Sequence, residues 1–252
     1  MRIIGRIVLS FFLVLFFAGT ALPWGNGPTH FSIGYDVISA DSNGVISSEH
    51  ESLFIRANSC PDIAWTQVFK ARGLEYVHSM EFADAVYQVA VTYYAWYPEW
   101  VATAYGWGAH LSADEVIHQH ITEEQPTHQL IELSIDTIIY WGDAPPGGWE
   151  QYNVGPDCCN PWLIYLASKL YRQDHPGVAL AYPWRVLFAL EGLRTTISAE
   201  YAYIQAKGND DLSEWFLQLM IDQDNLDGDW HPYYVDSVDA AQTWIKNHSL
   251  SP

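Results

Sequence analysis

Residues 99–121 read EWVATAYGWGAHLSADEVIHQHI, and this stretch decides what the chain can be. It is mostly apolar, and it contains His110-Leu-Ser-Ala-Asp114-Glu-Val-Ile-His118, in which a metal-ligand type recurs at every fourth position. On an α-helix, positions i, i+4 and i+8 lie close to one stripe, so these three side chains point the same way. The stretch therefore predicts one long helix with two imidazoles and a carboxylate on one face.

Such a face needs a counter-charge. A packed helix face is normally apolar, and polar groups buried there without partners lower stability substantially. A divalent metal removes this penalty because it binds neutral imidazole and ionised carboxylate together. His128 and Glu132 repeat the four-residue spacing just after Pro126, although a solvated helix face is the alternative for that pair alone. We therefore predict a metal site.

Three further residues upstream are candidate ligands. His30 stands at the start of a predicted helix, Asp62 follows Pro61, and His78 precedes another helix start. Each is weak evidence by itself, because a lone histidine is usually a structural or surface residue. Together with the five helix residues they give eight candidate ligands.

The rest of the chain indicates an all-α fold, a single multi-helix bundle. Apolar residues recur at helical spacing, and alternation typical of strands is not evident. Thr29 is a plausible N-cap. Gly106 and Gly108 weaken the central helix but would let another helix approach closely. The predicted helices are 29–40, 50–57, 79–97, 99–121, 127–141, 162–172, 184–206, 212–221 and 235–246.

Size and charge limit the possible functions. The chain has 252 residues, 49% of them hydrophobic, which suffices for one sizeable core. Its net charge of −19 argues against a general binder of nucleic acid or anionic membranes, because phosphates are repelled. Bound metal can reverse the sign locally. We expect no stable nucleic-acid partner, and the sequence leaves the oligomeric state open.

The N-terminus is typical of a secretory signal peptide, residues 1–21. Arg2 and Arg6 form a short basic region, residues 7–17 are apolar apart from one serine, and residues 19–21 are small. An uncleaved membrane anchor is the alternative. We therefore expect a secreted or periplasmic protein.

The mature chain is predicted to form one domain, residues 22–252. Its parts are a metal-binding half (24–141), a loop rich in glycine and proline (142–161) and a helical C-terminal half (162–250). The C-terminal half has no assignable motif, and it would either complete the bundle or cover the cleft.

The three cysteines are Cys60, Cys158 and Cys159. Outside the cell one disulfide is expected, and adjacent cysteines pair only through a strained ring. Cys60 with one member of the pair is the preferred arrangement, and the sequence leaves open which.

Several stretches resemble the zinc-dependent phospholipase C/D family, which includes bacterial phosphatidylcholine-preferring phospholipase C and the catalytic domain of glycosylphosphatidylinositol-specific phospholipase D. The resemblance spans Trp24 to Trp141, and the spacing within 110–118 is closer to the phospholipase D-like branch. The stretches are WGNGPTHFSIG (24–34), HESLF (50–54), CPD (60–62) and GWGAHLSADEVIH (106–118).

The resemblance implies an all-helical protein with three zinc ions in a cleft. Asp114 would bridge two of them, the first also held by His30 and Trp24. The chain departs from the family pattern at Trp24. In the bacterial phospholipase C the free α-amino group of the first Trp is a zinc ligand, whereas here cleavage after Ala21 would leave Leu22-Pro23 ahead of Trp24. Either its amino group is not a ligand or further trimming occurs. The second ion would be held by Asp62, His78, His110 and Asp114, and the third by His118, His128 and Glu132.

The implied activity is hydrolysis of phospholipid head-group phosphodiesters by a metal-activated water. Three zinc ions and three carboxylates would leave the cleft at about +3, which attracts a phosphodiester to an acidic protein. Asp62 is the candidate catalytic base, or it merely orients the water. The expected partners are a phospholipid or other phosphodiester substrate and, transiently, a membrane surface.

Two other functions remain open. Fungal single-strand-specific zinc nucleases share the fold, but they typically place five residues, with a Gln-Pro pair, between the helix Asp and the next His. Here only three residues separate Asp114 from His118. The second alternative is a non-catalytic helical domain with structural zinc, since sequence cannot count open coordination positions. A metal-free polar network is the third reading.

Overall fold

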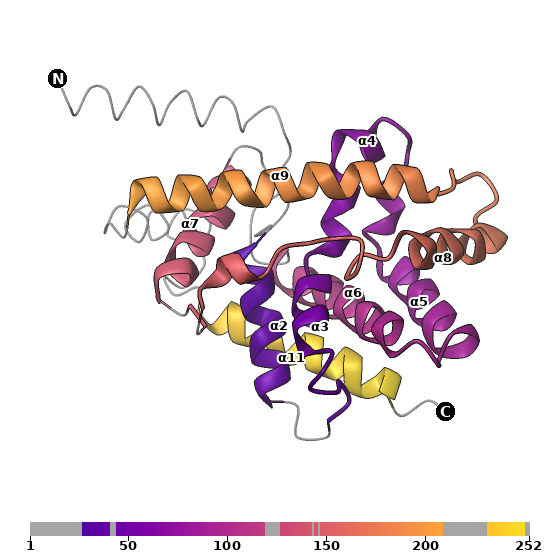
Figure 1. Cartoon of the computed structure of the whole chain (residues 1–252), viewed down its shortest axis with the longest axis horizontal. Helices are drawn as coiled ribbons and strands as arrows, with labels where there is room; N and C mark the ends of the chain where they lie inside the picture. Colours follow the sequence, from indigo (N-terminus) through magenta and orange to yellow (C-terminus); the bar gives the residue numbers. More distant parts are fainter. Residues whose placement is uncertain are drawn as a thin grey trace.

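Helix α6 (Pro98–Ile117) is the central element of the fold, and it packs against α2, α3, α5 and α11. Most of its residues are buried on every side, which is typical of a helix enclosed by others. Figure 1 shows it in the middle of the molecule, with α11 along one side and α9 along the opposite side. The long helix predicted across 99–121 is therefore present as far as Ile117.

The computed structural model describes residues 27–40, 44–118, 127–142, 144–145, 147–208 and 231–249. Within these residues the fold is all-α and contains no strand, so the predicted fold class is confirmed. None of the described helices is both long and apolar enough to cross a membrane. The predicted helix 212–221 and the predicted signal peptide lie outside the described residues. Besides α6, the α-helices are α2 (Pro28–Ala40), α3 (Glu51–Ala57), α4 (Gln67–Lys70), α5 (Met80–Gln88), α7 (Thr127–Gly142), α8 (Pro161–Asp174), α9 (Pro183–Lys207) and α11 (His231–Ser249).

Helix starts follow the local sequence. Proline occupies the first turn of α2, α6, α8 and α9, where its missing N–H would have had no partner. Asn160 caps α8 by accepting hydrogen bonds from the backbone N–H groups of Trp162 (3.0 Å) and Leu163 (3.2 Å). The prediction that Thr29 is an N-cap is wrong: α2 begins one residue earlier, and the Thr29 hydroxyl instead donates to Asp136.

The helix predicted over 79–97 is interrupted. Helix α5 ends at Gln88 and continues as a π-helical turn, η3 (Val89–Tyr93), before the chain turns toward α6. Pro98 disfavours helical geometry at Tyr97, which separates this segment from α6.

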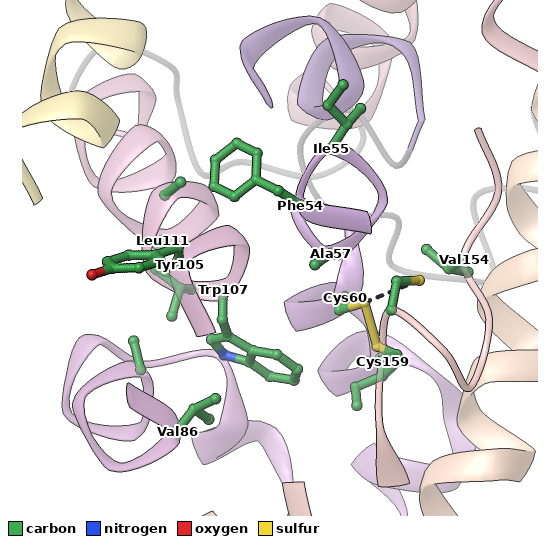
Figure 2. Close-up of a cluster of buried hydrophobic side chains, with 14 of the residues drawn as sticks. Phe54, Ile55, Ala57, Cys60, Val86, Tyr105, Trp107, Leu111, Val154 and Cys159 are labelled. Atoms are coloured by element: carbon green, nitrogen blue, oxygen red, sulfur yellow. Dashed lines mark hydrogen bonds between the residues drawn. A yellow bond between two sulfur atoms is a disulfide. The ribbon is translucent and has the colours of Figure 1, made fainter. Parts of the chain in front are cut away.

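Two glycines on α6 allow close helix packing. A Cβ on Gly106 would lie 2.7 Å from the Cβ of Ala57 in α3. A Cβ on Gly108 would lie 2.3 Å from the indole of Trp244 in α11. The predicted role of these small residues is therefore confirmed. Figure 2 shows the adjoining core, with Ala57 and the indole of Trp107 between α3 and α6.

The C-terminal half completes the bundle. Helix α9 buries a stripe that includes Val186, Leu190, Leu193 and Ile197, and it packs on α8, α4 and the 3₁₀ turn η1 (Cys60–Trp65). Helix α11 packs on α6 and α2. Both helices thus support the segments that carry predicted ligands.

A disulfide joins Cys60 to Cys159, while Cys158 is a buried free thiol (Figure 2). The prediction that Cys60 pairs with one of the two adjacent cysteines is confirmed. The bond ties η1 to the loop before α8, two residues away from Asp62.

Candidate metal centre

Five of the predicted ligands meet in one buried group, which we call the His/Asp cluster. They come from four segments far apart in the sequence. His30 lies on α2, Asp62 in η1, His78 directly after the 3₁₀ turn η2 (Glu75–Val77), and His110 and Asp114 one turn apart on α6.

Asp114 lies between the histidines of the cluster. Its Oδ2 atom is 3.1 Å from Nε2 of His78 and 3.3 Å from Nε2 of His110. Its other oxygen, Oδ1, is 3.6 Å from Nε2 of His30. The two oxygens of one carboxylate thus face different imidazoles.

Asp62, in η1, faces the same three histidines as Asp114 does from α6. Its Oδ1 lies 3.4 Å from Nε2 of His110 and 3.6 Å from Nε2 of His78, and its Oδ2 lies 3.9 Å from Nε2 of His30. The ligand atoms form two overlapping groups, each within 4.8 Å. One contains His30, Asp62 and His110, and the other contains His78, His110 and Asp114.

A backbone contact fixes the proton on His110. Its Nδ1 lies 2.6 Å from the carbonyl oxygen of Asn58, and a carbonyl can only accept, so Nδ1 carries the proton. In this tautomer of the neutral imidazole, Nε2 carries no proton and presents its lone pair. It faces the oxygens of Asp62 and Asp114 and lies 2.9 Å from Nε2 of His78. Acceptors gathered in this way require a cation, either a proton on a neighbouring imidazole or a metal ion.

The pKa shifts show the same need for positive charge. Burial raises the pKa of Asp62. Burial also acts to raise the pKa of Asp114, but its combined attraction and hydrogen bonds to His110, His78 and His30 outweigh burial and hold that pKa well below its usual range. Burial opposes protonation of His78, yet hydrogen bonding to Asp114 and Asp62 raises its pKa to about 9. Without metal, the cluster thus draws a proton onto His78.

The carboxylate oxygens fit a metal ion. Among the described residues, both oxygens of Asp62 and both of Asp114 are buried without a well-directed hydrogen bond. Buried carboxylates normally have several such bonds, and a divalent cation can take their place. Imidazole nitrogen with carboxylate oxygen is a donor set that zinc accepts. The cluster could therefore hold metal, whose identity and number belong to the proposal below.

The remaining predicted ligands lie around this cluster or outside the described residues. His118 follows the last turn of α6, with its Nε2 3.8 Å from Oδ2 of Asp114. Glu132 on α7 is buried, and burial followed by the charge of Asp114 raises its pKa well above the usual range. His128 belongs to α7, but its side chain is outside the described part, as is all of Trp24.

One edge of the cluster is open. The side chain of His118 is 32% exposed and that of His78 is 10% exposed, whereas His30, Asp62 and His110 are fully enclosed. The ring of Trp65 lies 5.2 Å from that of His78 at this edge.

Several supporting residues were not predicted. The side chain of Asn58 donates to the carbonyl of His30 at 2.8 Å. Asp136 on α7 accepts from the backbone N–H (2.8 Å) and hydroxyl (2.6 Å) of Thr29, beside His30, and it is hydrogen-bonded to Glu200 on α9. Such partners orient ligands and tune their basicity.

No protein-family model, curated protein or solved structure matched the chain. What the cluster can do therefore follows from its own geometry and from the sequence resemblance.

Proposed function

We propose that the protein is a zinc-dependent phosphodiesterase that hydrolyses phospholipid head-group phosphodiesters. The main support is the position of Asp114, whose two oxygens face His30 on one side and His78 and His110 on the other. This arrangement suits a carboxylate that bridges two metal ions. The resemblance of the sequence to zinc-dependent phospholipases C and D supports the same function.

The ligands divide between the ions as the resemblance implies. His30, Asp62, His78, His110 and Asp114 would hold two zinc ions, with Trp24 a further candidate ligand, and His118, His128 and Glu132 would hold a third. Bound zinc would supply Lewis-acid chemistry, polarising a phosphoryl oxygen and lowering the pKa of water.

The protein groups have separate tasks. Asp62 has two buried oxygens with no well-directed hydrogen bond among the described residues, so one could hold zinc while the other accepts the proton of the attacking water or orients that water. Asn58 keeps the proton of His110 on Nδ1, so that Nε2 remains a donor to the metal. The phosphodiester would approach from the edge at His118 and His78, the partly exposed side chains, while His30, Asp62 and His110 stay enclosed.

The test is phosphorus NMR of mixed phospholipid vesicles incubated with the zinc-loaded protein. A new head-group phosphomonoester signal would indicate C-type cleavage, and phosphatidate would indicate D-type cleavage. Asp114→Asn should abolish either product. Asp239→Asn, which changes an exposed carboxylate on α11, is the matched control and should retain full activity.

Three outcomes would contradict the proposal. Faster hydrolysis of single-stranded DNA than of any phospholipid would favour a nuclease. Stoichiometric zinc without any hydrolysis would favour a structural zinc domain. Retained activity in Asp114→Asn would remove the bridging role of that residue.

A further inference from the structure

The first turns of α8 and α9 form a continuous aromatic surface, the α8–α9 patch. On the α8 side, the ring of Trp162 lies 6.1 Å from that of Tyr165, which stacks at 5.7 Å on Tyr182 just before α9. The Nζ atom of Lys169 lies 5.8 Å from the centre of the Tyr165 ring. The patch consists of Trp162, Tyr165, Tyr182, Trp184, Arg185 and Phe188.

On the α9 side the contacts continue without a break. The guanidinium of Arg185 lies 5.2 Å from the ring centre of Tyr182 and 5.1 Å from that of Trp184. The ring of Trp184 lies 6.3 Å from that of Phe188. Contacting aromatic rings therefore extend from α8 to α9, with Lys169 and Arg185 lying over them.

The solvent-facing side of the first turns of α9 is apolar, although the exposed face of a surface helix is normally polar. Trp184 is 51% exposed and Phe188 64% exposed, with the exposed Leu187 between them, while Val186 and Leu190 face the core. A helix that is apolar on both faces is normally buried. Further along, the outward face carries the exposed pair Glu191 and Arg194, so the apolar surface is confined to the first turns.

The charge of this region is opposite to that of the chain. Residues 161–194 contain four basic and two acidic side chains. The whole chain has 11 basic and 30 acidic residues, which leaves seven basic and 28 acidic elsewhere. None of the six residues of the patch has a carboxylate side chain. The overall charge argues against a general anionic binder, but at physiological salt repulsion is screened beyond about 8 Å, so the local sign decides the contact.

We infer that the α8–α9 patch is the surface through which this protein docks on a phospholipid bilayer that contains anionic lipid. Tryptophan and tyrosine favour the boundary between head groups and acyl chains, and phenylalanine and leucine can enter the apolar region. Arg185 and Lys169 would meet lipid phosphates. A carbohydrate site would be expected to place carboxylates or amides among the rings, and the patch offers none.

A series of contacts connects α9 to the His/Asp cluster. Gly192, one turn beyond Phe188, packs on Thr66, since a Cβ there would lie 3.6 Å from Cγ2 of Thr66. Thr66 follows Trp65, which contacts His78 at the open edge. The inference deepens the proposed function by naming the surface that would meet the lipid substrate, but it does not depend on catalysis.

The experiment is flotation of the zinc-loaded mature chain, residues 22–252 without the apolar N-terminal run, with vesicles of phosphatidylcholine containing about 30 mol% phosphatidylglycerol, in parallel with phosphatidylcholine alone. The double variant Trp184→Ser with Phe188→Ser should lower the partition coefficient by at least about tenfold, because it removes the largest inserting surface. Arg185→Gln with Lys169→Gln should lower binding to the anionic vesicles by about fivefold per residue and flatten its salt dependence.

Trp141→Ser is the matched control, since Trp141 on α7 is 41% exposed and its neighbour Tyr140 contacts the far end of α9. It should float like the wild type. A second control, Trp96→Ser, changes another exposed aromatic cluster. Circular dichroism of every variant would establish that a loss of binding is not a loss of folding.

The inference is overturned if the wild type does not float, if the Trp184 and Phe188 variant floats equally well, or if Trp96→Ser or Trp141→Ser loses as much binding. Retention on immobilised glycans or a protein partner without vesicle binding would also overturn it. Flotation without hydrolysis would contradict the proposed function and leave the docking surface intact.

Discussion

The carbonyl of Asn58 accepts the Nδ1 proton of His110 at 2.6 Å. Asn58 is the C-cap residue directly after α3, so this contact connects the central helix α6 to α3 through a metal-ligand candidate. Its side chain also donates to the backbone carbonyl of His30 at 2.8 Å. One buried residue therefore orients two histidines that come from different helices.

Asn58→Ala should weaken zinc binding by about 10- to 100-fold, the usual effect of removing a group that orients ligands. The substitution removes the hydrogen bond to His30 but leaves the backbone carbonyl for His110, so the loss reports the position of His30. Competition against a chromophoric chelator measures the affinity. Gln67→Ala, at an exposed position, is the control. Unchanged zinc affinity in Asn58→Ala would limit Asn58 to a structural role.

Gly108→Ala should destabilise the protein, although alanine is the better helix former. The added Cβ would lie 2.3 Å from the Trp244 indole, and overpacking of this kind costs about 1–3 kcal/mol. Chemical denaturation measures the free energy of unfolding. In Gly142→Ala, at the end of α7, the new Cβ would meet no atom within 4 Å, so this control should be neutral or slightly stabilising. Equal effects of both changes would contradict close packing at Gly108.

Cys60→Ala should lower stability by about 2–5 kcal/mol, because the bond to Cys159 closes a long loop and restricts the unfolded chain. Cys60 is the informative position, since the free Sγ of Cys158 lies 4.0 Å from Cys60 Sγ and could replace Cys159 as its partner. Cys158→Ala removes no crosslink and is the control. Denaturation under oxidising and reducing conditions measures both. A reductant that leaves the wild type unchanged would argue against a stabilising disulfide.

Much of the site could be predicted from local spacing. His110, Asp114 and His118 repeat at one helical turn, and their direction follows from helix geometry alone. His30, Asp62 and His78 are each weak candidates from the sequence, and only the family resemblance groups them, because no local pattern links three segments that meet only in the folded chain. The structure brings His30, Asp62, His78, His110 and Asp114 together.

The supporting residues show what local patterns leave out. Asp136 continues the four-residue repeat of His128 and Glu132, so its inward position was open to prediction from the same pattern. Glu200 interrupts the apolar stripe of α9, a signal that a buried partner exists but not which one. Asn58 has no such signal, because its contacts to His30 and His110 depend entirely on how α2, α3 and α6 pack.

The buried carboxyl group of Glu200 should make the stability of the protein depend on pH. Its buried carboxyl is hydrogen-bonded to Asp136, and burial followed by the charge of Asp136 raises the pKa of Glu200 well above the usual range. The folded protein therefore keeps a proton on Glu200 at pH values where the unfolded chain has released it, since the ordinary pKa of glutamate is about 4.3. This contribution is complete below that value and is lost as the pH rises toward the folded-state pKa.

Glu200→Gln should therefore flatten the decline of Tm on the alkaline side, since glutamine resembles the protonated acid and has no proton to lose. Thermal denaturation at a series of pH values above about 4.3, at constant saturating zinc, measures the slope for each protein. Titration of the metal ligands is common to all variants, so the difference from wild type isolates Glu200. Glu191→Gln, an exposed change on the same helix, should follow the wild-type curve. A Glu200→Gln curve parallel to wild type at every pH would mean that Glu200 does not hold a proton in the folded protein.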